Sequence, residues 1–151
     1  MSTVAACLPG EPELGDLTRP GNLPDHLLDY AVARAEGFEL RHWPELGAQY
    51  WKLYLDGEPI AYIGVFGLQN LRAAKGFEHY SPSRNPTYSS EIITRERIGT
   101  HFDEVGRQWV GSECGPTGRL FFQTGSTPGI AALRCYVAKR ARQNRLPAAS
   151  E

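Results

Sequence analysis

Two segments of the sequence carry residue types that bind anions. One is a helix start, where Ser126 and Thr127 precede Pro128 and offer hydroxyl groups beside the free N–H groups of a first helical turn. Arg134 follows about two turns later on the same helix. The other is a polar segment that mixes tyrosines with small side chains. Its candidate ligand-binding residues are Tyr80, Ser81, Ser83, Arg84 and Tyr88.

If these two segments meet in space, they would form a pocket or ridge for a phosphate-bearing small molecule such as a nucleotide. Capping alone is the alternative for Ser126 and Thr127, because every helix needs partners for its first N–H groups. For the tyrosine-rich segment, the alternative is a long surface loop that binds nothing.

Residues that could hold a metal or act as nucleophiles are scattered along the chain. No two histidines or cysteines have the close spacing of metal ligands, and the residues concerned are His26, His42, His79, His101, Cys7, Cys114 and Cys135. The sequence also lacks a G-x-S-x-G elbow and a phosphate loop ending in Gly-Lys-Ser/Thr. We therefore predict no metal, no cofactor and no catalytic residue, and a binding protein rather than an enzyme.

The overall charge argues against a protein that coats nucleic acid. There are 16 basic and 17 acidic residues, giving a net charge of -1. A basic cluster near the C-terminus leaves a contact to acidic protein or nucleic acid open, with a solvated helix end as the alternative; its members are Lys139, Arg140, Arg142 and Arg145. The odd number of cysteines, the lack of a long apolar run and the lack of a signal peptide predict a cytoplasmic protein without a membrane span.

Helices are expected near both ends of one domain over residues 22–146. Residues 1–21 are rich in proline and glycine and predict a flexible tail, from which Leu14 and Leu17 could dock on the body. Asn22 is the expected cap of the first helix, and Gly37 ends it. The last helix follows Gly125, and residues 147–151 are expected to fray.

Strands are expected between the helices. The strongest hairpin pairs residues 50–55 with residues 60–66 across Asp56-Gly57, and the second strand is apolar on both faces, which predicts a central position. Weaker signals mark strands at 38–43, 100–110 (a hairpin turning at 103–106) and 119–123, and a helix or edge strand at 91–98. We predict an α+β fold, in which a mostly antiparallel sheet of about four to six strands packs against the two terminal helices. A long loop is expected at 69–90.

Three blocks of the sequence, taken in order, resemble the NinX-like family of small bacteriophage accessory proteins. They are LLDYAVARAEGF (27–38), YSPSRNPTYSSEIITRERI (80–98) and GSTPGIAALRCYVAKR (125–140). The resemblance implies an origin in phage or prophage accessory regions, and no biochemical activity is established for the family. After the Ser-Pro-Ser motif, the family typically has a Trp and glycines. This chain has the residues RNPTYSSE (84–91) there instead.

The resemblance and the lack of catalytic motifs together predict an accessory protein that acts by binding in the cytoplasm of the host bacterium. The favoured partner is a host protein, whose binding would alter host physiology or defence. The alternative is a protein that binds or sequesters a small anionic ligand such as a nucleotide. Nucleic acid is possible as a partner but not favoured, and formation of a homo-oligomer is possible.

Overall fold

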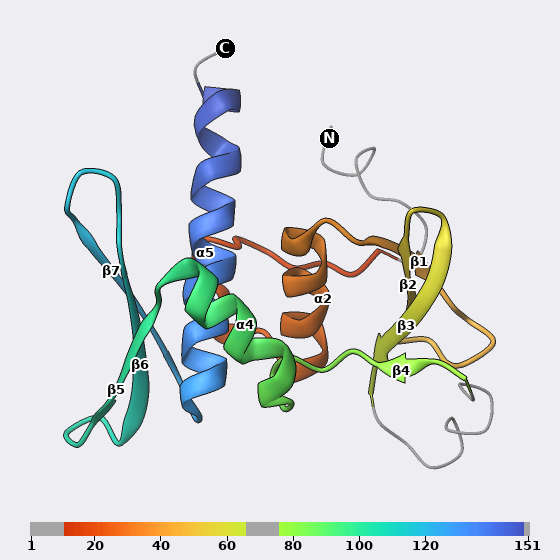
Figure 1. Cartoon of the computed structure of the whole chain (residues 1–151), viewed down its shortest axis with the longest axis horizontal. Coiled ribbons are helices and arrows are strands. Elements are labelled where there is room, and N and C mark those ends of the chain that lie inside the picture. Colours follow the sequence, from red (N-terminus) through yellow and green to blue (C-terminus); the bar gives the residue numbers. More distant parts are fainter. Residues whose placement is uncertain (1–10, 66–75, 150–151) are drawn as a thin grey trace.

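Helices lie between two β-sheets in the computed structural model, which describes residues 11–65 and 76–149 (Figure 1). The first sheet has the order β1-β2-β3-β4, formed by Glu39–His42, Tyr50–Leu55, Glu58–Gly64 and Glu78–His79. The second has the order β5-β6-β7, formed by Gly99–Asp103, Gln108–Cys114 and Leu120–Gly125. The helices of the described part are α2 (Asp25–Glu36), α4 (Pro86–Glu96) and α5 (Pro128–Ala149), preceded by the 3-10 turn η1 (Pro20–Asn22).

The expected α+β class is confirmed, and the strands divide between two sheets instead of forming one. The division follows from α5, which is buried on several sides and therefore needs cover from both directions. Strands β6 and β7 approach its backbone directly. A Cβ atom at Gly111 or at Gly125 would lie 2.7 Å from a backbone atom of Ala131, so only glycine permits this contact. The side of α5 away from these strands packs against α2 and α4 (Figure 1).

The predicted hairpin is confirmed as β2 and β3, which pair antiparallel. Asp56 (φ 52°) and Gly57 (φ 83°) both have positive φ, as a type I′ turn requires. Strand β3 lies between β2 and β4, and its residues 61–64 are buried. Ile63 belongs to the main core and Tyr62 to a smaller cluster, so both faces of this strand are covered, as expected.

Two helix starts differ from the sequence-based expectation. Asn22 belongs to η1, and the N-cap position of α2 is Pro24, whereas Gly37 ends the helix as expected with φ 95°. The expected loop 69–90 is partly wrong, because it contains β4 and the start of α4; residues 69–75 lie outside the described residues. The side chain of Asn85 caps α4 by accepting a hydrogen bond from the Thr87 N–H at 3.0 Å. Residues 91–96 are therefore helical.

The N-terminal segment lies against the body from residue 11 onward. Leu14 and Leu17 pack on the main core, as the sequence suggested. Glu11 forms an ion pair of 3.1 Å with Arg34 of α2. Residues 1–10 of the expected tail lie outside the described residues. At the other end, the backbone of α5 is helical to Ala149.

Candidate functional site

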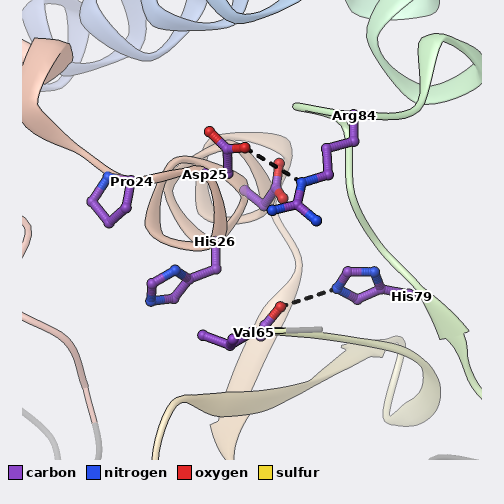
Figure 2. Close-up of a pocket in the computed structure, with 8 residues that line it drawn as sticks. Pro24, Asp25, His26, Val65, His79 and Arg84 are labelled. Atoms are coloured by element: carbon purple, nitrogen blue, oxygen red, sulfur yellow. Dashed lines mark hydrogen bonds and ion pairs between the residues drawn. The ribbon is translucent and has the colours of Figure 1, made fainter. Parts of the chain in front are cut away.

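A pocket of about 380 Å³ lies where the first turns of α2 face the end of β3 and the segment between β4 and α4 (Figure 2). Five of its eight lining residues have titratable side chains. The full lining is Pro24, Asp25, His26, Asp29, Gly64, Val65, His79 and Arg84. Because these residues come from four separate segments, the pocket exists only in the folded chain.

Arg84 and Asp25 form a loose ion pair at the edge of this pocket. Nε of Arg84 lies 3.4 Å from Oδ2 of Asp25, and the two side chains are 62% and 39% exposed (Figure 2). An exposed pair of this kind contributes little to stability. In the described part of the chain, the side chain of Arg84 has no other hydrogen-bond partner, so its terminal nitrogens remain available to a ligand.

Asp29 holds the segment that carries Arg84. Its Oδ1 accepts the backbone N–H of Ser83 at 2.8 Å, and its Oδ2 accepts the Ser83 hydroxyl at 3.0 Å, across 54 residues of sequence. Asp29 is only 3% exposed. Burial raises the pKa of Asp29 to about 7, although the Ser83 hydrogen bonds act in the opposite direction. This buried link fixes the position of the neighbouring Arg84.

Two histidines complete the polar lining. Nε2 of His79 lies 3.2 Å from the carbonyl oxygen of Gly64, which can only accept, so this nitrogen donates (Figure 2). Nε2 of His26 is buried and has no hydrogen-bond partner in the described residues. Burial is the main cause that lowers the pKa of both His26 and His79. Both imidazoles are therefore neutral at neutral pH.

Of the residues predicted in the tyrosine-rich segment, Arg84 lines the pocket. Tyr80 is buried in the main core, where the centroid of its ring lies 4.8 Å from the centroid of the Tyr88 ring. The Ser81 carbonyl accepts the N–H groups of Arg84 (2.9 Å) and Asn85 (2.8 Å) and thereby shapes the turn before α4. Ser83 is engaged by Asp29. Burial, together with the nearby Glu78, raises the pKa of Tyr88.

The predicted residues at the start of α5 have local partners. Oγ1 of Thr127 accepts the N–H of Ile130 at 3.1 Å, which is a capping bond, and Ser126 is exposed. Nη1 of Arg134 donates to the carbonyl of Thr124 at 2.8 Å. Burial lowers the pKa of Arg134, and Asp25 opposes this shift.

The first turns of α4 and α5 are neighbours, but they do not share the pocket. A Cβ atom at Gly129 would lie 3.8 Å from Oγ of Ser89 and 3.9 Å from Oγ1 of Thr127. The pocket itself is lined by no residue of α5. The structure thus brings the two predicted segments side by side, yet only Arg84 among the predicted residues reaches the pocket.

The basic cluster near the C-terminus has acidic partners within the protein. Lys139 lies 2.9 Å from Glu96, and Arg140 lies 3.5 Å from the same carboxylate. Arg142 pairs with the buried Glu113. The side chain of Arg145 lies outside the described residues. These internal partners leave less positive charge for an acidic partner than the sequence alone indicates.

Sequence reasoning missed most of the pocket. In the sequence, His26 and His79 are only two of the scattered histidines, and no motif marks Asp25 or Asp29 as binding residues. One signal was present, because Asp25 and Asp29 are four residues apart and must share a helix face. No local signal indicates that residues near 64, 79 and 84 would face them.

The described residues form a two-sheet α+β fold with a polar pocket at the start of α2. The model of the family described as Bacteriophage P22, NinX matches residues 20–140, which include every lining residue of the pocket. The chain therefore belongs to this family, as the three sequence blocks suggested. No curated protein matches the sequence.

Two further classes of site find no support in the described part of the chain. No group of three or more His, Cys, Asp or Glu side chains there could hold a metal ion. Among the helices that are described, none is long and apolar enough to cross a membrane.

Proposed function

We propose that the protein acts by binding, and that the pocket between α2, β3 and the segment carrying Arg84 holds a small molecule with an anionic group. The observation that carries this proposal is the guanidinium group of Arg84. It faces a pocket of about 380 Å³ and is held by one loose ion pair (Figure 2). Pockets of roughly 300 to 1,000 Å³ are typical of small-molecule sites.

Arg84 is well suited to anchor an anionic group. A guanidinium group offers a planar fork of N–H donors that matches a carboxylate or phosphate. The Asp29–Ser83 link fixes the backbone beside it, so the point from which this side chain extends is positioned before a ligand arrives. Preorganisation of this kind lowers the entropic cost of binding.

Binding is favoured over catalysis by how the polar groups of the pocket are used. Both carboxylate oxygens of Asp29 are engaged by Ser83. No serine or cysteine is among the described residues that line the pocket, so its two histidines have no hydroxyl or thiol nucleophile beside them to activate. The remaining groups can donate or accept hydrogen bonds, which is what recognition of a ligand requires.

Native mass spectrometry of protein purified from host cells tests this function. Wild-type protein should carry a small-molecule adduct, and Arg84→Gln should lose it. Arg41→Gln is the matched control, because Arg41 also forms an exposed ion pair, with Glu39 at 2.8 Å, and does not line the pocket. An adduct that survives Arg84→Gln, or the absence of any adduct from wild-type protein, would contradict the proposal.

A host protein is a second candidate partner, supported by the face of the second sheet that points away from α5 (Figure 1). Leu120 and Phe122 alternate on β7 and are each 55% exposed. Exposed apolar side chains on one sheet face are typical of interaction surfaces. Under this second proposal, the protein acts in the host cytoplasm.

A pull-down from host lysate tests the second proposal. If the wild type captures a host protein that Phe122→Asp loses and Leu55→Asp retains, the proposal is supported. Equal capture by both variants would refute it.

A further inference from the structure

The ligand class of the pocket can be narrowed from the charges that line it. Resting on the proposed function above, we propose that the pocket selects a small zwitterion, in which a carboxylate binds Arg84 and an ammonium group binds Asp25. The geometry that points to this class is the placing of two opposite charges, from α2 and from the segment before α4, on one pocket wall (Figure 2).

The Asp25–Arg84 pair can open without leaving an unpaired charge. Its 3.4 Å separation and high exposure make the direct contact weak. A ligand carboxylate would accept from the terminal nitrogens of Arg84, and a ligand ammonium would donate to Asp25. Each protein charge therefore exchanges one partner for another, and neither is left alone in the pocket.

A purely anionic ligand is less well matched. A phosphate or nucleotide would bring more than one negative charge toward Arg84, the only cationic residue among the described residues that line the pocket. The same ligand would lie near the carboxyl groups of Asp25 and Asp29. The two histidines do not offset this, because their lowered pKa leaves them neutral. Arg134 of α5 does not line the pocket, and its Nη1 donates to the carbonyl of Thr124.

The rest of the lining fits the short body of such a molecule. Pro24 and Val65 offer apolar surface, and Val65 is 45% exposed. The imidazole of His26, which lacks a partner at Nε2, can donate or accept one further hydrogen bond. A carboxylate, an ammonium group and a short apolar chain are together the size of an amino acid.

Ligand titrations of the full chain, followed by backbone NMR, test whether the pocket prefers zwitterions to ligands with a single charge. The probes are glycine, β-alanine and 4-aminobutyrate, which differ in charge separation, with butyrate and butylamine as single-charge analogues and inorganic phosphate as the anion control. We expect at least one zwitterion to bind about tenfold more tightly than either single-charge analogue. If butyrate or phosphate binds as tightly as every zwitterion, the proposed preference for zwitterions is overturned. The proposed ligand site would still be supported by that result.

Two variants assign the two ends of the ligand. Asp25→Asn should remove the advantage of the zwitterion and tighten butyrate binding, because Asp25 no longer competes for Arg84 and is no longer left unpaired. Arg84→Gln should weaken zwitterion and butyrate alike, and Glu39→Gln serves as the control at an exposed ion pair away from the pocket. Zwitterion binding that survives Asp25→Asn would overturn the assignment. If no probe shifts resonances of the pocket and the native mass spectrum of wild-type protein shows no adduct, the proposed function itself fails.

Discussion

Replacing Asp29 with asparagine should stabilise the protein at and above neutral pH. The substitution keeps the shape of the side chain and both links to Ser83, because the amide oxygen can accept the Ser83 N–H and the amide nitrogen can donate to the hydroxyl. What it removes is a carboxyl group that must ionise while only 3% exposed.

The magnitude follows from the pKa of Asp29, which burial raises from 3.8 to about 7. Between these values the folded state retains a proton that the unfolded state has lost, so the free energy of unfolding falls as the pH rises through this window. Each pKa unit corresponds to about 1.4 kcal/mol. From about pH 5 to about pH 7 the wild type should therefore lose roughly 3 kcal/mol of stability through this group.

Urea denaturation followed by tryptophan fluorescence at several pH values measures this effect. The lowered pKa of His26 and His79 contributes with the opposite sign, because the unfolded state binds the additional protons there. The difference between the wild type and Asp29→Asn cancels that contribution and isolates Asp29. Asp56→Asn, in an exposed turn, is the matched control. A difference that stays constant from about pH 5 to about pH 8 would refute the reasoning.

Two further predictions concern the core around α5. Gly111→Ala should lower the free energy of unfolding by about 1 to 3 kcal/mol, because a Cβ atom there would lie 2.7 Å from the backbone of Ala131. Gly21→Ala, with open space around its Cβ position, should change little in the same urea denaturation experiment, and equal losses would argue against direct strand–helix contact. Burial raises the pKa of Cys135 to about 12, whereas Cys114 is exposed. A thiol reagent mapped by mass spectrometry should therefore label Cys114 in the folded protein and Cys135 only after unfolding, and early labelling of Cys135 would contradict its burial.

Local signals predicted the elements whose conformation is set within a few residues. Asp56-Gly57 specifies a turn with positive φ at both positions, and the hairpin follows. Thr127 before Pro128 specifies a capped helix start. The start of α4 carries a similar signal in Asn85-Pro86, which lies within the expected loop 69–90 and instead begins a helix.

Features that depend on distant residues could not be predicted in this way. The division into two sheets depends on how closely β6 and β7 approach the backbone of α5, which the pattern of the strands does not encode. The pocket depends on the link between Asp29 and Ser83, which are 54 residues apart. The candidate residues at the start of α5 were attractive because helix starts bind anions, yet Thr127 has a capping partner of its own.

The central claim is that Arg84 anchors a ligand in the pocket. The most direct measurement is the side-chain Nε–H resonance of Arg84 in an NMR spectrum of the full chain, recorded before and after addition of the small-molecule fraction of host lysate. We expect this resonance to shift together with the backbone amides of residues 25–29, because the ligand displaces Asp25 from Arg84. An unchanged Arg84 resonance, or shifts confined to residues 126–134, would contradict the claim.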